Sequence, residues 1–218
     1  VHDNYYVPMD LFDGHVYAKG SLILSMMEDV LGSDAFWKAV QHYTKENQYK
    51  CVETQDLKKS IEDVTGQNLD WFFKQWLYEA GYPKYDVKWN YTQRNKSVKI
   101  KIEQVQNGNL FKMPVKIKID KEDHIIWVED KEVVFEIPAL KKPKLVIFNS
   151  GLMIPSELTF HKSISEWVLQ LETASHILDR IAAINVLKDK KGRRVVELAL
   201  LKAAETDPFW GVRKEAVY

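Results

Sequence analysis

Tyr17 is the residue whose type and position offer the clearest chemistry. It stands at the start of a predicted helix, in the run Tyr17-Ala18-Lys19-Gly20. A phenol stays neutral below about pH 10 and offers a directed O–H donor. Such a donor can stabilise the oxyanion that forms when a carbonyl is attacked, and losing one typically lowers the rate about a hundred- to a thousandfold. Because a lone tyrosine at a helix start is more often a packing residue, the assignment depends on its surroundings.

Other familiar site patterns are absent from the sequence. No two of the 6 histidines have the His-Glu-x-x-His spacing, and no Cys-x-x-Cys, Gly-x-Ser-x-Gly, P-loop or Gly-x-Gly-x-x-Gly occurs. The single cysteine, Cys51, lies between two predicted helices and is interpreted as a packed thiol. The sequence therefore predicts no metal ligands in this chain and leaves Tyr17 as the candidate catalytic residue.

Composition argues against two classes of partner. The 31 basic and 31 acidic residues cancel, so no global field draws the chain to nucleic acid or to an anionic membrane. No apolar run reaches the roughly 20 residues that a membrane-spanning helix requires. The basic run at 188–194 has no interleaved aromatic residues. It is interpreted as a solvated turn between two helices, and we expect no nucleic-acid site.

Residues 1–83 have the hydrophobic period of helices, and this segment must position Tyr17. Gly66 is predicted to end the third helix. Ser33, Thr54 and Asn68 are predicted to cap the second, third and fourth helices. The fourth helix carries a wide apolar face and is closed by a Gly-Tyr-Pro sequence.

The rest of the chain has two further patterns. Over 84–160 the period falls to two in several short segments without intervening helices, which predicts an antiparallel β-sandwich with one buried face. The helical period returns over 161–218, where Arg180 and Arg213 occupy equivalent positions in two similar segments. This is typical of the start of a HEAT-like helical repeat array, although only two copies are visible. The expected fold class is therefore multidomain α+β.

An ordered set of residues connects Tyr17 to a known family. The set comprises Tyr-x-Lys-Gly at 17–20, Met27-Glu28, Asp56-Leu57, Phe72-Phe73-Lys74-Gln75-Trp76-Leu77 and Gly81-Tyr82-Pro83. Over residues 14–83 it closely resembles the second half of the catalytic domain in the aminopeptidase N family of gluzincins. The resemblance implies that the parent protein is a zinc-dependent aminopeptidase with Tyr17 as its catalytic tyrosine. It also implies that 1–83 is the helical end of the catalytic domain, followed by a β-sandwich and a helical-repeat domain.

The same resemblance implies what this chain does not contain. In the family, zinc is held by the two histidines of His-Glu-x-x-His and a later glutamate, and all of these precede the tyrosine. Only 16 residues precede Tyr17, so we expect the zinc ligands to lie in a missing N-terminal catalytic half. The isolated chain is then expected to bind no zinc at that site and to hydrolyse no peptide. Peptide substrates belong to the parent protein.

Three neighbours of Tyr17 are weaker candidates, and two classes of function stay open. His15 is interpreted as part of the approach loop, Lys19 as solvent-facing or paired with an acid, and Gly20 as permitting close helix packing. The parent is either an active aminopeptidase or a zinc-free scaffold whose helical repeats bind other proteins. Retention of the Tyr17 hydroxyl favours the enzyme, because a scaffold does not need it.

Overall fold

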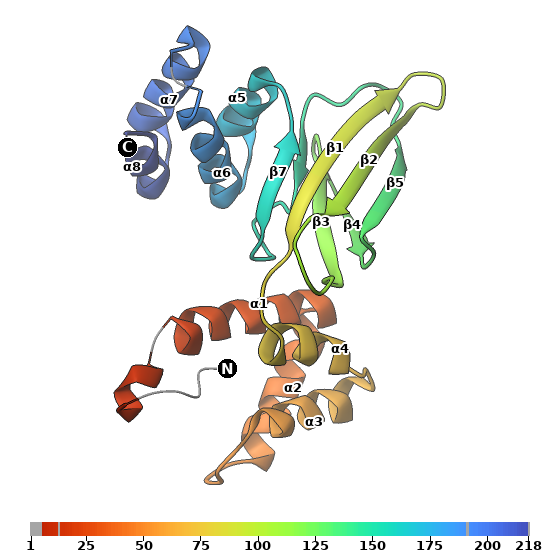
Figure 1. Cartoon of the computed structure of the whole chain (residues 1–218), viewed down its shortest axis with the longest axis vertical. Coiled ribbons are helices and arrows are strands. Elements are labelled where there is room, and N and C mark those ends of the chain that lie inside the picture. The colour runs from red at the N-terminus through yellow and green to blue at the C-terminus, as the bar shows by residue number, and fades with distance from the viewer. Residues whose placement is uncertain (1–5, 13, 191, 218) are drawn as a thin grey trace. The chain divides into compact units, whose positions relative to one another are not determined.

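The chain folds into two compact units, Val1–Gly81 and Tyr82–Tyr218. The computed structural model describes residues 6–12, 14–190 and 192–217. The first unit is helical, and the second combines two small sheets with helices (Figure 1). The predicted α+β class is therefore confirmed. Lys191, part of the basic run at 188–194, lies outside the described residues.

The first unit buries the apolar faces that the helical period predicted. Its elements are η1 (Pro8–Leu11), η2 (His15–Lys19), α1 (Gly20–Leu31), α2 (Ser33–Glu46), α3 (Thr54–Thr65), α4 (Asp70–Phe73) and η3 (Lys74–Tyr78). Met26 and Met27 of α1 are fully buried, as are Phe72 and Phe73 of α4. Gly66 ends α3 with φ +67°, in the left-handed conformation that glycine adopts without strain.

All three predicted helix caps are wrong by one residue. Ser33 and Thr54 are the first residues of α2 and α3 and do not precede them. The Ser33 hydroxyl donates to the Glu28 carboxylate at 2.7 Å. Glu53 precedes α3 and forms a capping box in which its own N–H donates to Asp56 at 2.8 Å. In both places a carboxylate is the acceptor, of the Ser33 hydroxyl in one and of the Glu53 N–H in the other. A charged acceptor makes a stronger hydrogen bond than a neutral one.

The fourth predicted helix is divided into α4 and η3. Leu69 is the N-cap residue of α4, so the predicted cap Asn68 lies one residue too early, although its side-chain oxygen accepts the N–H of Asp70 at 2.8 Å. In η3 the helix widens to a π-turn, closed by the Glu79 N–H donating to the Lys74 carbonyl at 3.0 Å. Trp76 stays buried, so the apolar face survives the change of helix type.

The second unit begins with seven strands in two sheets. They are β1 (Lys84–Thr92), β2 (Ser97–Gln104), β3 (Met113–Ile119), β4 (Glu122–Val128), β5 (Glu132–Pro138), β6 (Val146–Phe148) and β7 (Glu157–His161). One sheet has the order β5-β2-β1-β7 and the other β4-β3-β6. All pairs are antiparallel except β1 with β7, which is parallel. The prediction of purely antiparallel strands is therefore wrong for the first sheet, and β7 was not predicted.

The apolar side chains that alternate along the strands are buried, as the period of two predicted. Val98, Ile100 and Ile102 of β2 are completely buried. The ring of Tyr85 in β1 lies edge-on to that of Phe148 in β6, with centroids 5.2 Å apart. Because β1 and β6 belong to different sheets, this contact joins the buried side of one sheet to the other.

Four helices complete the second unit: α5 (Ile164–Thr173), α6 (Ile177–Lys188), α7 (Arg194–Thr206) and α8 (Trp210–Val217). The Trp89 indole N–H of β1 donates to Glu166 of α5 at 3.0 Å. The Lys162 ammonium donates to the Val146 carbonyl of β6 at 2.8 Å and to Gln170 of α5 at 2.5 Å. Burial lowers the pKa of Lys162 to about 7. These bonds attach α5 to both sheets.

The two similar segments found in the sequence make equivalent contacts. Arg180 Nη1 donates to the carbonyls of Ala174 and the following residue at 3.0 and 3.2 Å. Arg213 Nη1 donates to the carbonyls of Asp207 and the following residue at 2.7 and 3.2 Å. Each arginine thus satisfies two carbonyls in the turn before its own helix.

Throughout the described part of the chain, no helix combines the length and the apolar character needed to cross a membrane.

Candidate functional site

Tyr17 lies in η2, a π-helical turn that leads directly into α1. The turn is closed by the Lys19 N–H donating to the Gly14 carbonyl at 2.9 Å, a bond that spans five residues. Short π-helical segments are rare and occur frequently at functional sites. The sequence predicted a helix start here but not its type. His15 is the first residue of η2, so its assignment to an approach loop is wrong.

The Tyr17 side chain is exposed to solvent. It is 70% exposed, and its ring centroid lies 6.4 Å from that of Phe12 in a tilted contact. Its hydroxyl makes no hydrogen bond to another described residue. A phenolic O–H in this state is available to donate to a group that approaches from outside this unit.

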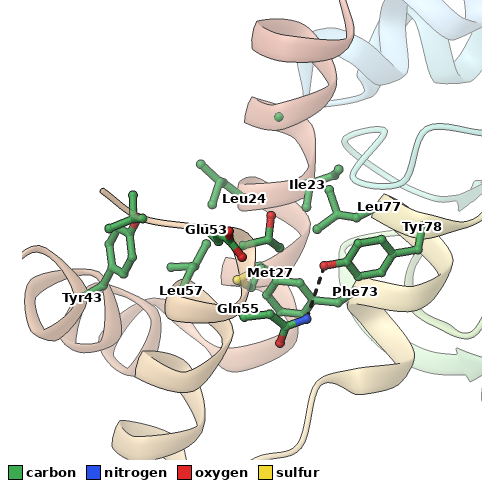
Figure 2. A pocket seen from close by; sticks show the side chains of 13 residues that line it. Ile23, Leu24, Met27, Tyr43, Glu53, Gln55, Leu57, Phe73, Leu77 and Tyr78 are labelled. Atoms are coloured by element: carbon green, nitrogen blue, oxygen red, sulfur yellow. Dashed lines mark hydrogen bonds between the residues drawn. The ribbon is translucent and has the colours of Figure 1, made fainter. Parts of the chain in front are cut away.

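A groove of about 670 Å³ begins one helical turn after Tyr17 (Figure 2). One wall is α1, the second is the segment that enters α3, and the third is formed by the end of α4 and by η3. The lining residues are Gly20, Ile23, Leu24, Met27, Tyr43, Val52, Glu53, Thr54, Gln55, Leu57, Phe73, Leu77 and Tyr78. Such an apolar lining with few polar groups is typical of surfaces that receive apolar side chains.

One hydrogen bond joins two lining residues of the groove. Gln55 Nε2 donates to the Tyr78 hydroxyl at 3.4 Å, which links the start of α3 to η3 (Figure 2). Met27 and Phe73 are buried, whereas Leu24 and Val52 are 41% and 44% exposed. Sequence reasoning missed Gln55 and Tyr78, because neither belongs to a motif. They meet only when the π-turn of η3 brings Tyr78 to the start of α3.

The described residues offer no alternative reactive centre around Tyr17. They contain no group of three or more His, Cys, Asp or Glu side chains that could hold a metal ion. Cys51 is exposed, so its interpretation as a packed thiol is wrong. Lys58 of α3 forms an ion pair with Asp70 of α4, and its hydrogen bond lowers the pKa of the Asp70 carboxyl. That pair ties two helices together and has the character of a structural contact.

Gly20 does not have the packing role that the sequence suggested. A β-carbon placed on Gly20 meets no atom within 4 Å, and the residue has an ordinary helical φ of −58°. Within this unit, neither conformation nor packing requires glycine at this position.

We expect Gly20→Ala to stabilise the isolated chain by about 0.5–1 kcal/mol, because alanine loses less backbone entropy than glycine in a helix. The matched control is Gly66→Ala, which must adopt a left-handed conformation and should destabilise by about 1 kcal/mol. Urea unfolding followed by circular dichroism measures both changes. A destabilised Gly20→Ala chain would contradict this expectation, because it would show that another part of the chain packs against position 20.

The sequence of this chain is similar to that of peptidases. Residues 3–76 match the Peptidase family M1 domain. A glutamyl aminopeptidase of Bitis rhinoceros is 30% identical over 129 residues, covering 56% of this chain. A leucyl aminopeptidase of Saccharolobus solfataricus is 28% identical over 168 residues, covering 72% of this chain. Tricorn protease-interacting factor F2 of Thermoplasma volcanium is 38% identical over 73 residues, covering 34% of this chain.

The fold is also found in a solved structure. The aminopeptidase A of Legionella pneumophila, crystallised with aspartic acid, matches 98% of this chain with a TM-score of 0.82 and 20% identity. The matched part is 27% of that chain. In the three curated relatives it is 14%, 21% and 9% of the length, so this chain spans a small part of the proteins it matches.

Proposed function

Since the chain belongs to peptidase family M1 through its first unit, we propose that it is a C-terminal part of a zinc-dependent aminopeptidase of the aminopeptidase N type. The parent enzyme removes amino-terminal residues from peptides. The observation that carries the proposal is Tyr17. Its Tyr-x-Lys-Gly context lies within the family match, and its hydroxyl is exposed on a π-turn at the start of α1.

In this proposal Tyr17 is the catalytic hydrogen-bond donor. Attack on a peptide carbonyl generates a negatively charged oxygen, and a neutral phenol positioned beside it stabilises that charge. The hydroxyl has no partner to give up among the described residues, so donation would break no existing bond of this unit. The π-turn places the ring at the start of α1, beside Phe12.

The metal chemistry is assigned to residues outside this chain. Zinc in enzymes takes His, Glu, Asp or Cys ligands in a compact set, and the described residues provide no such set. The described residues therefore do not fit a zinc site. We infer that the isolated chain is inactive and that Tyr17 works only beside a metal-binding half supplied by the parent.

The parts around the catalytic unit are proposed to be scaffold. We assign residues 1–83 to the helical end of the catalytic domain, 84–160 to a β-sandwich and 161–218 to the start of a HEAT-like repeat domain. The Tyr85–Phe148 contact between the two sheets supports the sandwich. The equivalent carbonyl contacts of Arg180 and Arg213 support the repeat.

The direct test compares the longer parent protein with this 218-residue chain. We expect the parent to contain stoichiometric zinc and to release amino-terminal residues from peptides with a free amino group. Amino-terminally acetylated peptides should be left intact. The short chain should show neither zinc at stoichiometric level nor peptidase activity. Metal analysis and mass spectrometry of the peptide products provide the readouts.

Two results would contradict the proposal. Zinc and activity in the purified 218-residue chain would show that the metal ligands lie within it. A parent protein that binds no zinc and cleaves no peptide would instead favour a scaffold whose helical repeats bind other proteins. A chelator control, with activity restored by added zinc, separates a true metal dependence from contamination by another peptidase.

A further inference from the structure

A second groove, of about 760 Å³, lies in the other unit of the chain and has a different character. It is bounded by the turn between β3 and β4, by the 139–145 loop between β5 and β6, and by the last turn of α5. Five lysines line it: Lys118, Lys121, Lys141, Lys142 and Lys144. This concentration of positive charge contrasts with the zero net charge of the whole chain.

Most of this positive charge is not neutralised by neighbouring side chains. Lys118 pairs with Asp123 at 3.2 Å, and Lys142 lies 6.0 Å from the ring centre of Trp89. Lys121, Lys141 and Lys144 are exposed and form no ion pair with another described residue. Their ammonium groups are therefore free to interact with an external anion.

Two acidic residues flank Lys121 in the lining of the groove. Glu122 is exposed and its carboxylate lies 3.8 Å from Nε2 of His124, whereas Asp120 binds the backbone. Asp120 Oδ1 accepts the N–H groups of Lys144 and Leu145 at 2.9 and 3.0 Å, and the Asp120 N–H donates to the Leu145 carbonyl at 2.8 Å. These three bonds attach the 139–145 loop to the β3–β4 turn. The lysines are thus presented from a fixed loop, which reduces the entropy lost when a ligand binds.

The groove is also partly apolar. Leu145 and Ala174 are buried beneath it, and Leu169 packs against them. Leu140, in the loop between the lysines, is 86% exposed. A free phosphate or another small anion would use the lysines but not this apolar surface. A peptide that carries both acidic and apolar side chains would use both.

Nucleic acid fits these residues less well than a peptide. Single-stranded nucleic acid binds through aromatic side chains on which its bases stack. The residues lining the groove include no Phe, Tyr or Trp, and Trp89 lies beside Lys142 without lining the groove.

We propose that this basic groove, formed by the β3–β4 turn, the 139–145 loop and the end of α5, is a docking site for an acidic peptide segment of a partner protein. The partner places Asp or Glu side chains beside Lys121, Lys141 and Lys144, and an apolar side chain against Leu140. The inference does not depend on the peptidase function, because the site lies entirely in the second unit.

The test uses a fluorescein-labelled peptide of alternating glutamate and leucine with the 218-residue chain, and fluorescence anisotropy as the readout. The double variant Lys141→Glu/Lys144→Glu should bind the peptide at least about tenfold more weakly, since two attractive contacts become repulsive. Salt at about 1 M should weaken binding to the unaltered chain as well. Replacing every glutamate of the peptide with glutamine should abolish binding.

The matched control is Arg94→Glu/Lys99→Glu, which changes the net charge equally at exposed positions that do not line the groove. It should bind the peptide like the unaltered chain. Equal losses in both double variants would overturn the proposal, because binding would then follow net charge alone. Equal binding of an oligothymidylate at the same lysines would also overturn it, by indicating a general polyanion surface. Circular dichroism confirms that each variant is folded.

Discussion

Tyr17→Phe in the longer parent protein is expected to lower turnover about a hundred- to a thousandfold while leaving its zinc content unchanged. The change removes one hydroxyl and keeps the ring, so the tilted contact with Phe12 survives. Losing a single donor to a developing oxyanion typically reduces kcat by this factor, equivalent to about 2.7–4 kcal/mol of transition-state stabilisation. Steady-state kinetics on a free-amino peptide, together with metal analysis, measures the effect.

The kinetic pattern separates catalysis from substrate binding. A donor used in the transition state lowers kcat and kcat/KM together, whereas a group that only binds substrate mainly raises KM. We expect the first pattern for Tyr17→Phe. The matched control is Phe12→Leu, which removes the neighbouring ring and keeps the hydroxyl. It should change turnover far less.

Stability distinguishes a catalytic hydroxyl from a structural one. The Tyr17 hydroxyl forms no hydrogen bond with another described residue, and the side chain is 70% exposed. The Tyr17→Phe substitution should therefore leave the free energy of unfolding of the 218-residue chain unchanged within about 0.5 kcal/mol. Undiminished turnover in the parent would remove Tyr17 from the mechanism. A large loss of stability would assign it a packing role.

Local patterns in the sequence predicted much of the architecture. The helical period placed α1 to α3, and Gly66 ended α3 in the left-handed conformation that its position required. Alternating apolar residues over 84–160 predicted that this segment forms short strands, because a half-buried strand must alternate, and β1 to β6 lie there. Tyr17 could be singled out because the family motif is local.

Features that depend on distant residues could not be predicted. Strand β7 is five residues long, and its parallel pairing with β1 begins where the Glu157 N–H donates to the Pro83 carbonyl at 3.1 Å. No local pattern around Glu157 indicates that this segment pairs with β1. The two π-turns and the Gln55–Tyr78 bond likewise arise from tertiary packing. The basic groove combines lysines from two separated loops, which only the fold brings together.

Arg180→Ala is expected to destabilise the second unit by about 3–5 kcal/mol. The Arg180 side chain is only 10% exposed, and its Nε and Nη2 atoms donate to both carboxylate oxygens of Asp207 at 2.7 and 3.0 Å. The Asp207 side chain is itself 7% exposed. Removing one member of a buried pair leaves the other charge buried without compensation, and this is the main source of the loss. Two carbonyls in the turn before α6 lose their donor at the same time.

Arg213→Ala provides the matched control for this effect. Arg213 occupies the equivalent position and donates to two carbonyls through Nη1, but it pairs with no carboxylate of another described residue. Its removal should therefore cost about 1–2 kcal/mol, the range for lost hydrogen bonds alone. The double variant Arg180→Met/Asp207→Leu should recover most of the loss, since it leaves no buried charge behind. Urea unfolding and amide hydrogen exchange in α6 and α7 measure all three. If Arg180→Ala and Arg213→Ala are equally destabilising, the carboxylate contributes nothing beyond the carbonyl contacts that the two arginines share.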